Sequence, residues 1–212
     1  MKHRSLQTLY KYWNGVRAGR IAPRRLEIEP ARIAGILAET FMLERVTATE
    51  FHFRLAGSRL CELFGLELRG TNFLDGWSAA DRAVLERQLA TVCEQGAVAT
   101  LTVEAGADVR SRIEIEVILL PLVHAGTKVE RIIGAMSTSS PAPWLAGDYL
   151  RDRRLISHEL IWPDGRPHAV IERAGGQAPF APALSGVRIV KSDRRQFRVL
   201  DGGRTEAKHS KS

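Results

Sequence analysis

The feature that most restricts the fold of this chain is a two-residue alternation near its middle. Within residues 111–126, charged and apolar side chains alternate over one stretch: Arg112, Ile113, Glu114, Ile115, Glu116 and Val117. Because successive side chains of a strand point to opposite faces, this pattern predicts a strand with one buried face and one face in water. Strands of that kind are typical of antiparallel sheets.

Further strands and helices are predicted around this strand. Period-two or apolar runs predict four more strands, at 40–46, 51–57, 99–105 and 130–139. A short helix is expected to start at Ser58 and end at Gly65, and a longer one capped by Ser78 to end at Gly96. The order strand, strand, helices, strand, strand, strand predicts an α+β fold, with a five-stranded antiparallel sheet and helices on one side.

The N-terminal residues predict a separate amphipathic helix. Its apolar face is formed by Leu6, Leu9, Tyr10, Trp13 and Val16. A helix this short is marginal alone, so its apolar face must bury against something. Two alternatives stay open: the helix packs on its own sheet, or on a neighbour's helix in a dimer or partner complex.

The composition changes after Ser140, where Pro141 and Pro143 begin a segment rich in turns. A hairpin is expected from 156–162 and 167–173, and one more strand pair within 187–203. The expected division of the chain is a basic amphipathic helix at 1–26, the sheet domain at 27–140, a Pro/Gly-rich extension with a hairpin at 141–186, and a basic strand or tail at 187–212.

The positive charge lies at the two ends of the chain. The formal net charge is +7, but residues 1–26 hold seven Lys/Arg and no acid, and residues 184–212 hold eight against three acids. The middle, 27–183, has 16 Lys/Arg against 21 acids. A nucleic-acid-binding domain normally carries its positive charge on the fold itself. Nucleic-acid binding through the basic termini is therefore only the third alternative for function.

Two stretches carry a resemblance to a known family. LYKYWNGVRAGRIAPRRLEIEP at 9–30 and FRLAGSRLCELFGLELRGTNFLDGW at 53–77, followed by a long helix and three strands, resemble the PAS sensory fold. More narrowly, the chain is similar to the single-PAS proteins of alphaproteobacteria grouped as PAS_5 (DUF1457), over roughly residues 5–145. The resemblance implies a PAS domain at 27–140 that binds a small molecule or a partner, often with dimerisation through a preceding helix. Some members are connected with motility and cell-cycle control.

The usual PAS cofactors are not favoured by the residues. A flavin photosensor needs a reactive cysteine in a polar stretch, whereas Cys61 lies among apolar neighbours. No histidine stands where a haem ligand would, and no group of residues has metal-ligand spacing. The cofactor is therefore unknown, and no nucleophile, base and orienting group can be named together, so we expect no enzyme.

The candidate ligand pocket is formed by apolar and aromatic side chains of the predicted sheet and its covering helices. These residues are Phe53, Leu63, Phe64, Trp77, Ile113, Ile115, Val117 and Ile133. A filled core would consist of the same residues, so both interpretations stay open. Arg54 is either a solvated residue paired with Glu44 or Glu116, or an anchor for an acidic ligand or partner.

The sequence thus predicts a non-catalytic regulatory PAS module in a bacterial signalling pathway. Its output would be a contact with a protein partner in trans, modulated by a small ligand or constitutive, and a homodimer is expected. The alternative is a pure interaction adaptor with a filled core. With two cysteines, Cys61 and Cys93, expected as buried free thiols, no signal peptide and no apolar run of membrane length, the expected location is the cytoplasm.

Overall fold

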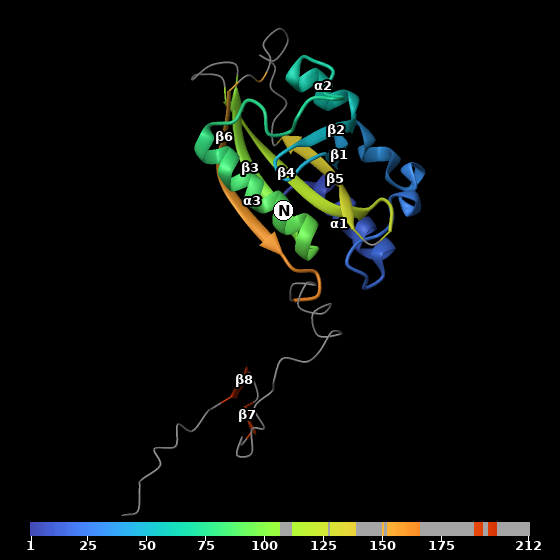
Figure 1. The fold of residues 1–212 in the computed structure, drawn as a ribbon, viewed down its shortest axis with the longest axis vertical. Coiled ribbons are helices and arrows are strands. Elements are labelled where there is room, and N and C mark those ends of the chain that lie inside the picture. Colours follow the sequence, from blue (N-terminus) through green and yellow to red (C-terminus); the bar gives the residue numbers. More distant parts are fainter. Residues whose placement is uncertain are drawn as a thin grey trace, which may run out of the picture. The chain divides into compact units, whose positions relative to one another are not determined.

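The computed structural model describes residues 1–106, 112–126, 128–138, 150 and 152–165, and the backbone of 189–192 and 195–198 (Figure 1). The chain divides into two compact units, Met1–Glu172 and Arg173–Ser212. The first holds the sheet and all the described helices. The second holds a strand pair, β7 (Ile189–Ser192) with β8 (Arg195–Arg198), which was predicted within 187–203.

The first unit is built on a six-stranded antiparallel sheet. Its strands are β1 (Thr40–Arg45), β2 (Phe51–Ala56), β3 (Val98–Gly106), β4 (Arg112–Val123), β5 (Val129–Thr138) and β6 (Asp152–Ile161). They lie in the order β2-β1-β5-β4-β3-β6. The α+β class and the PAS-like five-strand core are confirmed, and β6 adds a sixth strand at the edge next to β3.

The helices begin and end at residues that suit those positions. They are α1 (Arg4–Arg17), α2 (Ser58–Phe64) and α3 (Ala79–Gln95), with 3-10 helices η1 (Arg25–Glu27) and η2 (Pro30–Glu39). The Ser78 hydroxyl accepts a hydrogen bond from the Asp81 N–H at 3.1 Å and caps α3. Gly65 and Gly96 end α2 and α3 in the left-handed region. No helix among the described residues is long and apolar enough to cross a membrane.

Helix α1 packs on the face of the sheet opposite to α3. Leu6, Leu9 and Trp13 are fully buried, and the Trp13 indole donates to the Pro121 carbonyl of β4 at 2.8 Å. Of the two alternatives left open by the sequence, the structure therefore shows α1 on its own sheet. Figure 1 shows α3 in front of the strands and α1 behind them.

The burial of Glu116 corrects the prediction of one wet face on β4. The Glu116 carboxylate accepts hydrogen bonds from the backbone N–H groups of Lys2 at 2.8 Å and His3 at 2.9 Å, and the residue is only 8% exposed. Burial alone would raise the pKa of this carboxyl group, but the His3 and Lys2 N–H groups and the charged N-terminal amine of Met1 together outweigh it, and the pKa is lowered. Glu116 is not in water because the start of α1 covers it.

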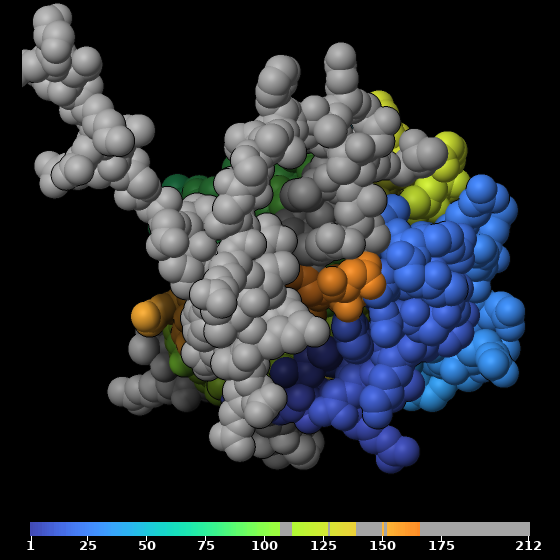
Figure 2. All heavy atoms as spheres, turned by 90° about the horizontal axis from the view of Figure 1, so that it is seen from below, coloured from blue at the N-terminus to red at the C-terminus, as the bar shows by residue number. Residues whose placement is uncertain are grey.

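Strand β6 includes most of 156–162, the first strand of the hairpin predicted from 156–162 and 167–173, and it joins the main sheet. Residues 152–161 pair with β3 along its whole length, from Val98 with Ile161 to Gly106 with Asp152. The predicted partner segment, 167–173, lies outside the described residues. The end of β6 is also tied to α1, because the buried Arg17 guanidinium donates to both Asp164 carboxylate oxygens, at 2.9 and 2.7 Å. Figure 2 shows the end of this segment (orange) beside the N-terminal residues (blue).

Candidate functional site

The candidate site is an aromatic cavity between the sheet, helix α2 and the segment that follows α2. Each strand places alternate side chains toward it, and the residue pairs Val117–Met136 and Val103–Ile115 lie opposite each other on neighbouring strands. The cavity is lined by Phe53, Phe64, Leu68, Phe73, Trp77, Val103, Ile115, Val117, Met136 and Arg153.

This cavity is almost completely filled. Its volume is about 20 Å³, whereas pockets for small ligands measure about 300–1,000 Å³. The rings pack against one another, with centroid distances of 5.9 Å for Phe53–Phe73 and 6.4 Å for Phe73–Trp77. A space of this size holds about one water molecule.

Arg153 from β6 contributes the only charged side chain among the residues that line the cavity. Its guanidinium carbon lies 5.2 Å from the Phe64 ring centroid and 5.6 Å from that of Trp77, which are cation–π distances. Its Nε has no hydrogen-bond partner among the described residues. Burial lowers the pKa of Arg153 and the charge of Asp75 opposes this shift, yet a guanidinium stays protonated at neutral pH.

Gly76 makes room for this arginine. A Cβ atom at Gly76 would lie 2.7 Å from the Arg153 Nη2, and the φ angle of +74° also favours glycine. The next residue, Trp77, forms an isolated bridge with Arg153. The local backbone thus positions the guanidinium between the aromatic rings. Sequence reasoning missed Arg153, although its alternation with Leu155 on one face of a strand was a usable signal.

The predicted pocket residues divide into two groups. Phe53, Phe64, Trp77, Ile115 and Val117 all line the aromatic cavity. Leu63 and Ile113 are half-buried and pack against the core, but they do not line the aromatic cavity. Ile133 points to the opposite face of the sheet, where it lines a hollow beneath η2.

Arg54 also lies on that opposite face. It forms an ion pair with Glu44, one of the two partners expected from the sequence. Glu44 is shared with Arg131, whose Nη1 lies 2.6 Å from the Glu44 Oε1. The surrounding hollow has a volume of about 340 Å³ and is lined by Arg25, Met42, Arg54, Leu55, Arg69, His124 and Arg131.

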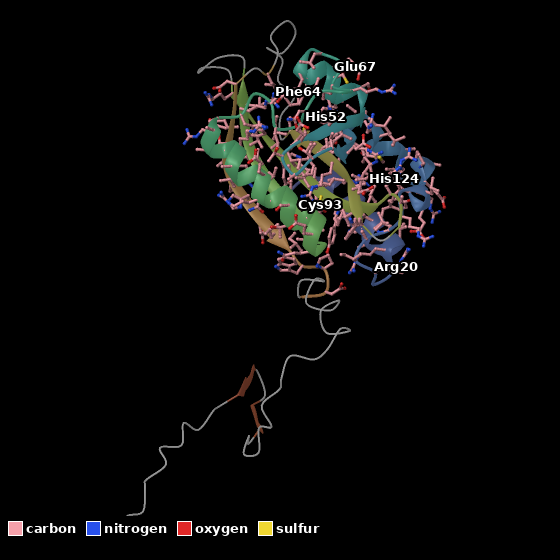
Figure 3. All side chains as sticks on the ribbon, viewed as in Figure 1. Arg20, His52, Phe64, Glu67, Cys93 and His124 are labelled. Atoms are coloured by element: carbon pink, nitrogen blue, oxygen red, sulfur yellow. The ribbon has the colours of Figure 1, made fainter. Side chains whose placement is uncertain are left out.

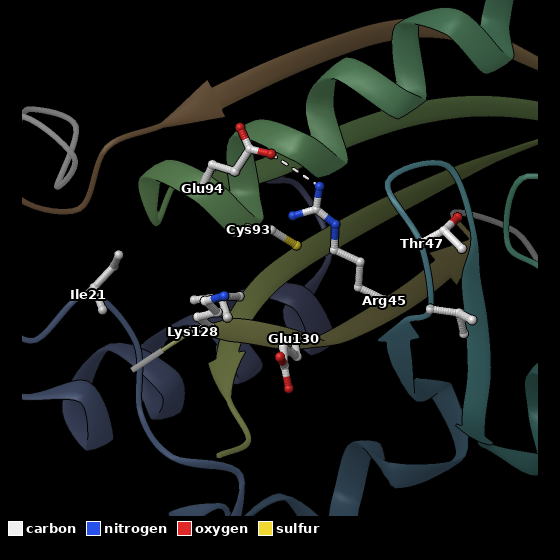
Figure 4. A pocket seen from close by; sticks show the side chains of 9 residues that line it. Ile21, Arg45, Thr47, Cys93, Glu94, Lys128 and Glu130 are labelled. Atoms are coloured by element: carbon white, nitrogen blue, oxygen red, sulfur yellow. Dashed lines mark hydrogen bonds and ion pairs between the residues drawn. The ribbon is translucent and has the colours of Figure 1, made fainter. Parts of the chain in front are cut away.

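A third hollow lies at the end of α3 (Figure 4). It measures about 620 Å³ and is lined by Ile21, Arg45, Val46, Thr47, Cys93, Glu94, Lys128, Val129 and Glu130. Arg45 pairs with Glu94 at 3.1 Å, and the two cations of the lining are matched by two carboxylates. This balance of charge gives the hollow no preference for an anion or a cation.

The two cysteines do not form a reactive centre. Burial raises the pKa of the Cys93 thiol to about 12, so it stays protonated at neutral pH and is a poor nucleophile. Figure 3 shows Cys93 on α3 and His124 at the connection between β4 and β5. Cys61 is half-buried on α2, and both thiols are free. Among the described residues, no three His, Cys, Asp or Glu side chains are grouped as a metal site would require.

Comparison with known families identifies the fold. The profile described as "PAS domain" (PAS_5) matches residues 1–137, more than half of the chain. The chain belongs to the PAS domain family. No curated protein matches it. Among solved structures, a LOV protein from Rhodobacter sphaeroides matches at 12% identity with a TM-score of 0.36, covering 55% of this chain and 71% of the other. A TM-score this low supports no inference about function.

Membership of the family defines the kind of protein. PAS domains are sensory and regulatory modules, generally without catalytic activity, and they commonly mediate protein interactions. The match ends before β6, so Arg153 is supplied to the cavity of this PAS protein from outside the matched residues.

Proposed function

We propose that this PAS protein is a non-catalytic regulatory module of a bacterial signalling pathway, and that its output is a contact with a protein partner in trans. The filled aromatic cavity carries the proposal. With about 20 Å³ free, no small ligand fits without displacing side chains. The interaction adaptor with a closed core is therefore the function that we favour.

Several observations support the absence of catalysis in this proposal. The buried Cys93 thiol is not activated, and the aromatic cavity carries one guanidinium and no base. The free cysteines favour the cytoplasm as its location. The resemblance to proteins connected with motility and cell-cycle control makes those pathways the first to test.

The proposal includes a homodimer that forms through α1, but with a face of the helix that only partly overlaps the one expected from the sequence. Leu6, Leu9 and Trp13 are buried in the chain's own core, so they are not available to a second copy. A contact between copies would instead use the half-buried Tyr10 and Val16 and the polar side of the helix.

The second candidate is a sensor in which a ligand displaces Arg153. It is favoured by one observation, the Arg153 Nε without a hydrogen-bond partner among the described residues. A ligand with an acceptor group and a planar body would satisfy that N–H and stack on Phe64 or Trp77.

Native mass spectrometry of the protein purified from its own host separates the two candidates. The adaptor predicts the mass of the bare chain, or of an integral multiple of it, under native conditions. Extra mass that is lost on denaturation would overturn the closed-core proposal and identify the ligand class. The same spectrum reports whether the homodimer exists.

A further inference from the structure

The hollow beside Arg54 is rich in arginine, and we call it the arginine groove: Arg25, Arg54, Arg69 and Arg131 with His124, over the apolar side chains of Met42 and Leu55. Four guanidinium groups converge here from η1, β2, the segment after α2, and β5. Three of them, Arg54, Arg69 and Arg131, belong to the middle of the chain, 27–183, which is acidic as a whole, with 16 Lys/Arg against 21 acids. The groove is therefore a local concentration of positive charge on an otherwise acidic fold.

The charge of the groove is only partly compensated. Arg54 and Arg131 share the single carboxylate of Glu44. Arg25 and Arg69 form no ion pair with another residue that the structure describes. Two guanidinium groups are thus held in place by Glu44, and two more are free to bind an external acid. A group that is already positioned loses less entropy on binding.

An apolar hollow continues directly from the arginine groove. It has a volume of about 150 Å³ and is lined by Ile28, Pro30, Ile33, Leu37, Thr40, Phe41, Met42, Leu55, Ala56, Gly57 and Ile133. Met42 and Leu55 line both hollows, which makes the two one continuous surface. Leu55 is 54% exposed and Leu37 is 39% exposed, so large apolar side chains face water at this place.

We propose that this surface docks an acidic, amphipathic segment of a partner protein. Its Asp and Glu side chains would bind Arg25 and Arg69, and its aliphatic side chains would cover Leu55 and enter the apolar hollow. The inference rests on the proposed function in trans and adds the chemistry of the partner. A nucleic acid fits less well, because none of the described lining residues is an exposed aromatic side chain on which a base could stack.

The test is a selection of random peptides displayed on phage against the full-length chain. We expect enriched peptides to combine Asp or Glu with Leu, Ile or Phe. Their affinity for the double variant Arg25→Glu/Arg69→Glu should fall about tenfold or more, because charge reversal places like charges opposite each other. Neither arginine holds another described residue in an ion pair, so the fold is expected to tolerate the change.

Matched controls separate the surface from general charge and apolarity. Arg87→Glu lies on α3, on the other face of the sheet, and should leave peptide affinity unchanged. Leu55→Ser should weaken binding, whereas Leu66→Ser, which changes a leucine of similar exposure outside both hollows, should not. Binding should also weaken as the salt concentration rises from about 50 to 500 mM.

Three results would overturn the inference. These are enrichment of basic or purely polar peptides, equal affinity for the Arg25→Glu/Arg69→Glu variant, or tight binding of a mixed-sequence oligonucleotide that this variant loses. Peptides that bind but are insensitive to all these variants would end the docking inference and leave the proposed protein contact intact. Extra mass in native mass spectrometry would instead end the closed-core proposal without affecting the peptide result.

Discussion

The two faces of the sheet hold hollows of opposite character. Between the sheet and α2, aromatic rings and the guanidinium of Arg153 leave about 20 Å³. On the face covered by α1 and η2, four arginines surround a groove of about 340 Å³. The place where a PAS domain would enclose a ligand is closed here, and the open, charged hollow lies on the outside. This contrast is the basis of the proposal that the protein acts through a surface contact.

The largest effect on stability is expected at α1, whose apolar side chains are part of the core. Trp13→Ala removes a fully buried side chain and its hydrogen bond to Pro121, so we expect a loss of about 3–5 kcal/mol in the free energy of unfolding. Urea denaturation followed by circular dichroism measures it. The exposed Lys11→Ala variant is the control, with a change of about 0.5 kcal/mol or less. If both variants were equally stable, α1 would not belong to the core.

The second prediction concerns the hydrogen bonds between the Glu116 carboxylate and the start of α1, whose contribution to stability depends on pH. The pKa of Glu116 is lowered in the folded state, so its stabilisation is present above the unfolded pKa of about 4.3 and is lost as the pH falls through the folded value. Glu116→Gln should cost about 1–3 kcal/mol at pH 7, and the difference from wild type should shrink below about pH 4. Urea unfolding at both pH values measures it. Glu114→Gln, at an exposed carboxylate, should show a much smaller difference; an equal one would contradict the role given to Glu116.

The third prediction addresses the closed cavity directly. Arg153→Ala removes the two cation–π contacts and should lower stability by about 1–2 kcal/mol. The space left between Phe64 and Trp77 should accept methylguanidinium, so millimolar amounts should raise the Tm of the variant and leave that of the wild type unchanged. The neighbouring, exposed Arg154→Ala is the control. A Tm of the Arg153→Ala variant that does not respond would mean that the cavity collapses without Arg153.

The smallest effect is expected at the third hollow, beneath the end of α3. Burial raises the pKa of the Cys93 thiol to about 12, so it is almost entirely protonated at pH 8. Iodoacetamide should therefore label the half-buried Cys61 well before Cys93, with no change in stability. Peptide mass spectrometry after timed labelling reports both rates. Faster labelling of Cys93 would show that this hollow opens to solvent and that its thiol is available.

Much of the fold was predictable because its signals are local. Strand β4 and the Ser78 and Gly96 caps of α3 appear in the structure where the sequence indicated them, although β4 is buried on both faces from Ile115 onward. Five residues of the predicted pocket meet at the aromatic cavity, to which β2, α2, β4 and the segment before α3 each contribute. Ile133 did not join them, since its neighbours on β5 take the inward positions.

Other features depended on contacts between distant parts of the chain. The strand pattern predicted at 156–162 does not reveal that β6 also pairs with β3, because β3 is about 50 residues away in the sequence. The charge of Glu116 predicted exposure, but the N–H groups at the start of α1 satisfied the carboxylate and allowed its burial.

By itself, the sequence determined the order of strands and helices, the PAS family and the apolar character of the core. The order of the elements and the apolar core follow from side-chain periodicity and capping, which act within a few residues. The family follows from the resemblance carried by residues 9–30 and 53–77. Only the tertiary structure decided that α1 covers the second face, that Arg153 closes the cavity, and that four arginines converge outside it. Those outcomes depend on which surfaces meet after the chain folds, and residues far apart in sequence carry no local record of their eventual neighbours.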